Sequence, residues 1–536
     1  MKIAGRIKKQ ILQKHILLLL GLALAGLLLR LNNFSQLFYY TMDEEAMNLI
    51  QRQIVLGQHY PLIGSVSPLG TYLGPIFYYF GALILWLSNL NPLGQEIFAI
   101  FLGTANIFLI YLVGRDLFSR KVGIFAAAFY SLSSLMILFD RRFWHLTPGP
   151  FLSLLVLWSI FKIKHGKIRF IYLLTAALIF GWNTDYTNLI LFLFTGLAWI
   201  IFKLPVRRKE IAIALAVFLV SNLPLAAFEL RHNFLNTKAV ISYLKHEQSF
   251  QKANDRETLG SNRFQQVQLT ASLPFVAFSR LFFINSSPVD IPEQHTYCKP
   301  YILERIGQQG KLWPFLAFLL IAAFAVLVWR ERNDKKAFGY KLVLSFYLIF
   351  QLGVLFYAAA FGGDVFEHYL ATLFPYFFLI SAVILAAIHS RFKLVALTLV
   401  ALFAVVNISA SLQAQQPLGF NNKLAATRYA LDKVGNADFS LDALGTCFRY
   451  DGFYYPFLMF GRHPVKSYQD PNYAWLFDYP VAEKHPAKVV VMVAPGKFEN
   501  QNFWDTYNRY QQWVTDRARF GGVEVLILDN SKGEFH

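Results

Sequence analysis

Runs of about 17–25 mostly apolar residues recur along this chain, and each is long enough to cross a bilayer as a helix. After residue 413 the pattern changes to short strand-like runs, at Val489–Val493 and Val523–Leu528, between helix-like stretches at Asn421–Val434 and Asn502–Arg517. The pattern predicts an all-α polytopic membrane protein followed by a small α/β domain. The candidate membrane segments are 16–34, 74–90, 96–113, 122–139, 148–163, 169–183, 186–202, 210–228, 313–330, 338–360, 369–389 and 392–411.

The positions of Lys and Arg indicate which of these segments cross, because basic residues concentrate in cytoplasmic loops. Only basic charges precede the first segment, which we interpret as an uncleaved span with a cytoplasmic N-terminus. If 74–90 lies at the outer surface as an interfacial helix, every basic short loop falls on the cytoplasmic side. We therefore predict 11 spans. The basic loops are 114–121, 162–169, 203–209, 330–341 and 389–393.

This topology divides the chain into two domains. Residues 1–412 form the transmembrane domain, with outer loops at 34–95 and 229–312. Residues 413–536 form an extracytoplasmic domain. The compact loops and the absence of an organelle-retention signal favour the plasma, or inner, membrane.

Composition excludes several classes of function. Of the 536 residues, 56% are hydrophobic and only 15% are charged, whereas soluble domains carry about 25% charged residues. The net charge of +18 is explained by cytoplasmic loops, so we expect no nucleic-acid partner. Cys298 and Cys447 are too few for a disulfide scaffold or a zinc ribbon. Both are expected outside, where two free thiols are favoured over a bridge.

Three consecutive acids follow the first span at the outer surface: Asp43, Glu44 and Glu45. Acids are scarce in this chain, and adjacent carboxylates repel one another, so such a cluster indicates a functional site. The alternative is that the three acids stabilise the N-terminus of a juxtamembrane helix.

An uncleaved first span, a long outer loop opening with Asp43-Glu44 and a helix marked by Gly74-Pro75 resemble the membrane-embedded GT-C glycosyltransferases. The closer resemblance is to their family 39, which includes protein O-mannosyltransferases and the lipid A aminoarabinose transferase. It covers roughly residues 10–410. Two further stretches agree, although in the second the family has Arg where this chain has His368. They are Leu223-Pro224 with Phe228-Glu229-Leu230-Arg231-His232, and His368-Tyr369 with Pro375.

The resemblance implies an inverting transferase that moves a sugar from a polyprenyl-phosphate donor to an acceptor at the outer face. The acceptor is a glycan, a lipid or a protein. The resemblance also implies that Asp43 is the general base on the acceptor hydroxyl, with Glu44 as its neighbour, and that Asp140 is a second outer acid. The residues expected to line the substrate cavity are Glu45, His59, Tyr60, Tyr78 and His368.

A lipid phosphate that leaves during the reaction requires cationic or backbone hydrogen-bond donors. Arg141 and Arg142 directly follow Asp140, and Arg231-His232 follows the seventh crossing segment on the outer side. We expect these residues to bind the donor phosphate, since guanidinium groups bind phosphate with two parallel hydrogen bonds. The alternative is that they anchor span ends at the lipid headgroups.

No nucleotide-binding or zinc-binding motif is present, so the sequence requires no cofactor. A divalent metal held by Asp364, Glu367 and His368 with Asp43 is a weaker alternative, because there is no Asp-x-Asp spacing. A transporter or flippase of lipid-linked glycans is the main competing function. Such proteins bury charges at mid-membrane and often have two similar halves, and this sequence shows neither. A third alternative is a scaffold that displays the C-terminal domain, for which Asp43 would be dispensable.

Overall fold

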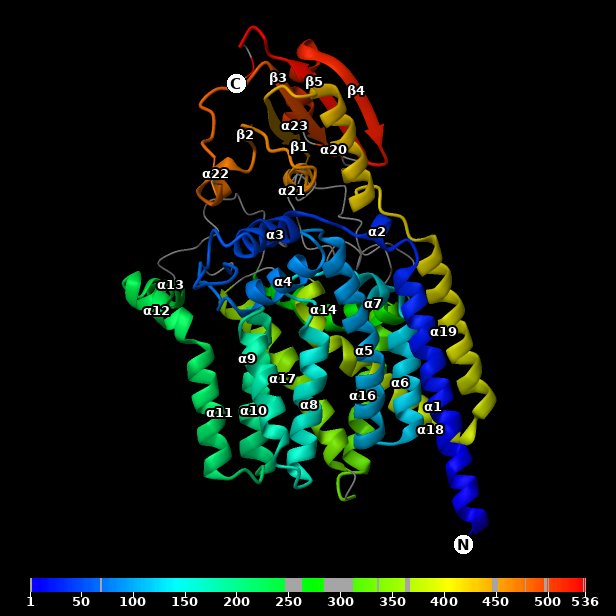
Figure 1. Ribbon diagram of the computed structural model, residues 1–536. Coiled ribbons are helices and arrows are strands. Elements are labelled where there is room, and N and C mark those ends of the chain that lie inside the picture. The colour runs from blue at the N-terminus through cyan, green and yellow to red at the C-terminus, as the bar shows by residue number, and fades with distance from the viewer. Residues whose placement is uncertain are drawn as a thin grey trace.

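The structure is a computed structural model in which a bundle of helices carries a small sheet-containing domain at one end (Figure 1). The N-terminus lies at the opposite end of the bundle. The described residues are 2–67, 70–245, 263–283, 312–334, 337–361, 367–445, 452–477, 479–495, 499, 501–533 and 535.

The predicted crossing segments are helical. In an apolar surrounding every backbone amide must find its partner within the protein, and a helix provides all of these partners within one segment. The bundle consists of α1 (Lys2–Leu31), α5 (Leu93–Leu117), α6 (Arg120–Leu132), α7 (Ser134–Phe139), α8 (Gly149–Lys164), α9 (Phe170–Trp182), α10 (Leu189–Phe202), α11 (Arg208–Ser221), α12 (Leu223–Arg231), α16 (Leu312–Arg330), α17 (Ala337–Phe361), α18 (Phe374–Arg391) and α19 (Lys393–Gln413).

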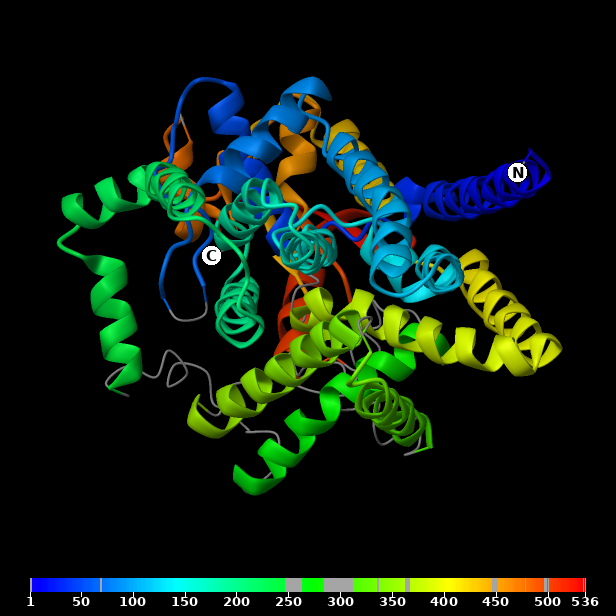
Figure 2. The same cartoon turned by 90° about the horizontal axis from the view of Figure 1, so that it is seen from below.

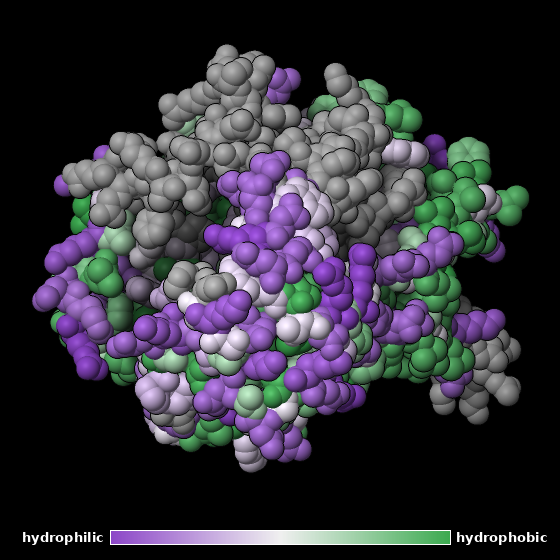
Figure 3. All heavy atoms as spheres, turned by 90° about the horizontal axis from the view of Figure 1, so that it is seen from above, coloured by the Kyte–Doolittle hydropathy of each residue, from purple (hydrophilic) through white to green (hydrophobic). Residues whose placement is uncertain are grey.

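Six helical segments in the described part of the chain are long and apolar enough to cross a membrane by themselves. The pair α11 and α12 makes a seventh if it is one span, bent by 48°. The remaining predicted spans correspond to shorter helices, so the number 11 stays a prediction. Large apolar side chains such as Leu394, which is 78% exposed, face outward. Seen from above, hydrophilic side chains gather over the C-terminal domain and hydrophobic ones lie towards the edge (Figure 3).

The turns that join α5 to α6, α8 to α9, α10 to α11 and α18 to α19 all lie at the end of the bundle remote from the sheet (Figure 1). These turns contain four of the predicted basic loops. Seen from below, α1 in dark blue and α19 in yellow lie on the same side of the bundle (Figure 2). The charge pattern and the fold therefore distinguish the same two ends of the molecule.

The segment predicted to lie at the surface forms α4 (Ile76–Leu87), which lies beneath α3 (Met42–Val55) at the end of the bundle nearest the sheet (Figure 1). Its 12 residues extend about 18 Å as a helix, whereas the hydrocarbon core is about 30 Å thick. Its length alone does not separate α4 from the 13-residue α9, but its position beneath α3 agrees with the predicted interfacial helix.

The segment predicted as the outer loop 229–312 contributes helices that pack on the bundle. Its described part contains α13 (Leu235–Leu244) and α14 (Arg263–Phe283), and α14 packs against α16 and α17. Its buried side chains follow the helical spacing i, i+3, i+4 that marks one apolar face. Pro274 and the polar residues between the apolar positions lower the mean hydropathy of α14, so the sequence did not mark it as a membrane segment. The buried residues include Leu273, Val276, Ala277, Phe278 and Leu281.

The C-terminal domain is built on a five-stranded sheet in the order β2-β1-β3-β5-β4. Strand β1 pairs in parallel with β2 and β3, and β5 pairs antiparallel with β3 and β4. Side chains alternate between two apolar clusters, one beneath α20 (Phe420–Val434) and one beneath α23 (Gln501–Tyr510). The predicted strands are confirmed as β3 and β5. The strands are β1 (Phe439–Leu444), β2 (Lys466–Ser467), β3 (Lys488–Val493), β4 (Val514–Phe520) and β5 (Val523–Asp529).

Helices α5 and α6 approach each other closely at two glycines, and small residues at such interfaces let membrane helices gain van der Waals contact. A Cβ on Gly123 would lie 2.6 Å from the Tyr111 carbonyl oxygen, and a Cβ on Gly114 would lie 2.9 Å from the Gly123 Cα. Neither contact is compatible with the present backbone.

We predict that Gly123→Ala destabilises the protein by about 1–3 kcal/mol, because overpacking forces the two helices apart. Thermal unfolding in detergent measures the effect. Gly196→Ala is the matched control, since a Cβ there meets nothing within 4 Å. Equal melting temperatures for the two variants would contradict the close packing of α5 and α6.

Candidate active site

The acidic cluster forms the first turn of α3, which begins with a capping box at Thr41 and Glu44. The Glu44 Oε2 atom accepts hydrogen bonds from the Thr41 amide at 3.1 Å and the Thr41 hydroxyl at 3.0 Å. Such a box satisfies backbone amides that the helix itself leaves free. Glu44 therefore has the helix-stabilising role that was the alternative for the whole cluster.

The other oxygen of Glu44 pairs with Arg142, so the structure brings two predicted site residues together. The Arg142 Nε and Nη2 atoms lie 2.7 and 2.6 Å from Glu44 Oε1. The guanidinium carbon lies 3.7 Å from the centre of the Trp144 ring, a cation–π contact that fixes its plane. The Arg142 side chain remains 20% exposed. Arg142 is thus positioned on two sides and still reaches solvent.

Asp43 differs from its two neighbours. It is half-buried, and within the described part of the chain no hydrogen bond or ion pair to its carboxylate is found. Tyr78 lies near it on α4. Burial raises the pKa of the Tyr78 phenol to about 12, and the charge of Asp43 contributes to the increase. The Asp43 carboxylate is therefore available to a substrate, with the buried Tyr78 beside it.

Glu45 requires a correction, because the structure places it in the junction with the C-terminal domain and not in a cavity. The side chain is 0% exposed. Its two oxygens accept four hydrogen bonds from protein donors, three at Oε2 and one at Oε1. The donors are the Gly452 amide at 3.0 Å, the Tyr455 amide at 2.9 Å, the Tyr468 hydroxyl at 3.1 Å and Gln469 Nε2 at 2.7 Å.

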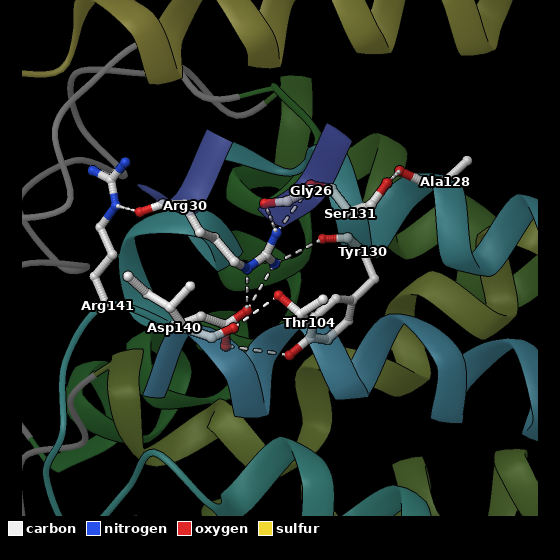
Figure 4. A network of polar contacts seen from close by, with 9 residues as sticks. Gly26, Arg30, Thr104, Ala128, Tyr130, Ser131, Asp140 and Arg141 are labelled. Carbon is white, nitrogen blue, oxygen red and sulfur yellow. Dashed lines mark hydrogen bonds and ion pairs between the residues drawn. The ribbon is translucent and has the colours of Figure 1, made fainter. Parts of the chain in front are cut away.

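Asp140 also has a different environment from the one predicted, since it is buried in an ion pair with Arg30 (Figure 4). Arg30 Nε and Nη2 lie 3.0 and 2.7 Å from Asp140 Oδ2, and the Tyr130 hydroxyl donates to Oδ1 at 3.3 Å. Arg30 and Asp140 are 0% and 2% exposed. The carboxylate neutralises a buried cation, which leaves it unable to serve as a second outer acid.

Arg141 likewise binds protein instead of a donor phosphate. Its Nε atom donates to the Arg30 carbonyl at 3.0 Å (Figure 4), and Nη2 donates to the carbonyls of Leu29 and Asn32, both at 2.7 Å. These carbonyls lie at the C-terminal end of α1, where a helix leaves its acceptors free and favours a cation. The side chain is 1% exposed, so Arg141 caps α1.

The remaining candidates fall into two groups. His368 contacts the Trp144 ring with a centroid separation of 4.9 Å, so Trp144 lies between His368 and Arg142. The sequence-based prediction gave Trp144 no role, and its position two residues after Arg142 was the available signal. His59 packs against Trp475 of the C-terminal domain at 5.3 Å, and Tyr60 is 62% exposed.

Arg231 and His232 lie apart from this group, at the end of α12. Helices α12 and α13 are at the edge of the bundle, whereas α3 lies over its upper end (Figure 1). The His232 ring stacks on Phe228 with a centroid separation of 4.2 Å. The structure therefore does not bring these two residues to the acidic cluster.

The described residues contain no group of three or more His, Cys, Asp or Glu side chains arranged to hold a metal ion. Glu367, a predicted ligand, forms an ion pair with the buried Arg280. Asp364, Cys298 and Cys447 lie outside the described residues, so the predictions made for them stay predictions.

Comparison with solved structures identifies the architecture. The ArnT structure from Cupriavidus metallidurans bound to undecaprenyl phosphate matches with a TM-score of 0.58 over 97% of this chain and 99% of that one, at 10% sequence identity. Its apo state matches at 0.58, over 96% and 98%, with 11% identity. The Archaeoglobus fulgidus oligosaccharyltransferase in complex with zinc and sulfate matches at 0.50, over 88% and 67%, with 14% identity.

The chain has the GT-C fold. A scan against protein-family models and a search of curated proteins find no match. The resemblance to GT-C glycosyltransferases is therefore confirmed at the level of the fold, while family 39 stays a prediction. At 10–14% identity, these GT-C neighbours show the architecture and not the substrate.

We predict that Asp140→Asn acts on stability and not on the chemical step. Breaking a buried ion pair costs about 3–5 kcal/mol, because the other charge is left uncompensated. The measurement is thermal unfolding in detergent, with Arg30→Met as the partner variant. If Asp140→Asn melts like the wild type but has lost catalytic activity, Asp140 is the second acid after all.

Proposed function

We propose that this chain is a glycosyltransferase that moves a sugar from a polyprenyl-phosphate donor to an acceptor hydroxyl, with Asp43 as the general base. The observation that carries the proposal is the difference between the three adjacent acids. Glu44 and Glu45 are occupied by protein partners, whereas the half-buried Asp43 is left accessible at the N-terminus of α3. A base must be able to reach the proton that it removes.

A cation for the leaving phosphate stands next to this base. Arg142 is bound to Glu44, the residue that follows Asp43, and its plane is fixed by Trp144. We assign the guanidinium nitrogen that is not paired with Glu44 to the donor phosphate. A preorganised cation near developing negative charge is the usual means by which enzymes stabilise such a transition state.

The fold supports the lipid carrier of the donor. The ArnT structure that matches over 97% of this chain was solved with undecaprenyl phosphate. We therefore propose a polyprenyl phosphate as the carrier, and membrane lipids as the surroundings of its chain. The sugar and the acceptor class are open.

The reaction is a single displacement. Asp43 takes the proton of the acceptor hydroxyl as its oxygen attacks the anomeric carbon from the face opposite the phosphate. The bond between that carbon and the phosphate oxygen breaks, and its electron pair stays on the polyprenyl phosphate near Arg142. The configuration at the anomeric carbon is therefore inverted.

We propose that the end of the bundle with α3 and the C-terminal domain faces outward from the plasma membrane. The support is that α1 begins, and four basic loops lie, at the opposite end (Figure 1). In this arrangement residues 1–412 form the catalytic membrane domain and residues 413–536 the extracytoplasmic domain. Lipid-linked sugars displayed on the outer leaflet would reach Asp43 and Arg142 without crossing the bundle.

We predict that Asp43→Asn lowers kcat by about 10²–10⁴-fold, the usual contribution of a general base. Purified protein in detergent is assayed for sugar transfer from a panel of polyprenyl-phosphate sugars, with membrane extract as acceptor. Asp432→Asn, at an exposed acid on α20, is the control. An active Asp43→Asn variant would show that the base is another residue. A wild type that transfers from no donor would favour the transporter.

We predict that Arg142→Lys raises the KM for the donor by about 10–100-fold, because a hydrogen bond to a charged group contributes about 1.5–3 kcal/mol. Lysine keeps the charge but loses the planar fork. Arg231→Lys is the comparison, since Arg231 is exposed and lies away from α3. A larger KM increase for Arg231→Lys than for Arg142→Lys would move the phosphate site to α12.

A further inference from the structure

The C-terminal domain is attached to the chain segment that contains Asp43 by two buried charged side chains, one from each partner. From the membrane domain, Glu45 points into the C-terminal domain and accepts its four hydrogen bonds there. These donors come from residues 452–469, more than 400 positions further along the chain. A buried carboxylate with four hydrogen-bond donors resists displacement, because losing its partners would leave a desolvated charge.

The second charge crosses the junction in the opposite direction. Lys423 on α20 is 0% exposed, and its Nζ atom donates to the Tyr40 carbonyl at 2.5 Å. The ammonium lies 4.5 Å from the centre of the Phe453 ring. The Phe420 amide also donates to the Phe38 carbonyl at 3.0 Å. Lys423 and Phe420 therefore hold the extended segment that leads into α3.

Packing around these contacts leaves little freedom for sliding. Phe38, Tyr40 and Phe420 have ring centroids 4.8–5.6 Å apart and share one apolar cluster with the sheet. A Cβ on Gly452 would lie 2.4 Å from the Tyr40 carbonyl oxygen. The backbones on the two sides of the junction are in direct contact, so the domain is docked and does not hang from a linker.

The two anchors lie on either side of the proposed base. Tyr40, whose carbonyl binds Lys423, is three residues before Asp43, and Glu45 is two residues after it. We infer that the C-terminal domain is a positioning element for Asp43, acting through Glu45 and Lys423. The inference rests on the proposed function, since it assumes that Asp43 does the chemistry. It makes Glu45 and Lys423 positioning residues, because they act through Asp43.

This role differs from that of a passive cover or an acceptor-binding module. Loss of a cover or of an acceptor site would weaken substrate binding and raise KM. Loss of positioning lowers kcat at nearly constant KM, since a displacement of about 1 Å at a reacting group can cost about 10²-fold.

The experiment is a double-mutant cycle on the full-length protein with Glu45→Gln, Asp43→Asn and the combined variant, measured as kcat and donor KM. We expect Glu45→Gln to lower kcat by about 10–100-fold with KM within about 2-fold. In the Asp43→Asn background the same change should have little further effect, because residues acting as one unit are not additive. Independent, multiplying losses in the cycle would overturn the inference.

Lys423→Met tests the second anchor with a side chain of similar length and no charge. It should reproduce the kcat loss and the non-additivity with Asp43→Asn, whereas Asp432→Asn on the same helix should leave kcat and KM unchanged. A Lys423→Met variant that loses no kcat would contradict the role of this anchor.

Hydrogen–deuterium exchange separates a failed inference from a failed function. In Glu45→Gln, amides at the start of α3 and at Gly452 and Tyr455 should exchange faster, while β3 and β5 should stay protected. This result does not depend on transferase activity. Faster exchange with a normal kcat would show that Glu45 anchors the domain but does not position Asp43. Unchanged exchange would show that Glu45 does not anchor the domain. If the wild type transfers no sugar, the proposed function fails, although the exchange result still tests the docking.

Discussion

The first turn of α3 has to accommodate three adjacent carboxylates and the free amides of a helix N-terminus in one buried place. Buried charges persist only when they are paired or fully hydrogen-bonded. The structure meets this constraint by giving the acids different surroundings. Glu44 accepts hydrogen bonds from Thr41 and Arg142, and Glu45 accepts hydrogen bonds from the C-terminal domain. Asp43 keeps access to solvent, and the partners of Glu45 tie the C-terminal domain to the start of α3.

The arginines at this end of the bundle obey the same electrostatic rule. Arg30 is paired with Asp140, and Arg141 donates to the free carbonyls that end α1, although its buried Nη1 atom has no hydrogen-bond partner among the described residues. Only Arg142 of these three combines an ion pair with partial exposure. The presence of these basic residues at the end of the bundle opposite the basic loops is thus explained for two of the three by internal packing. The third is the one suited to a ligand.

The partners of these charged side chains come from distant parts of the chain. Arg142 reaches Glu44 across 98 positions, and Gln469 reaches Glu45 across 424. Helix α14, from a segment that reads as an outer loop, inserts its apolar face between α16 and α17. The bundle and the C-terminal domain therefore form one framework around α3.

The sequence alone determined the features that depend on local composition: the apolar helices, the gathering of basic loops at one end, the short surface helix α4 and the strands β3 and β5. It also located the acidic cluster, because three adjacent acids are conspicuous in an apolar chain. Only the tertiary structure decided which acid is accessible, which arginine reaches solvent and that α14 joins the bundle. The reason is physical. Hydropathy and charge are properties of a segment, whereas the burial and the partners of a charged side chain are set by residues about 100 to 400 positions away.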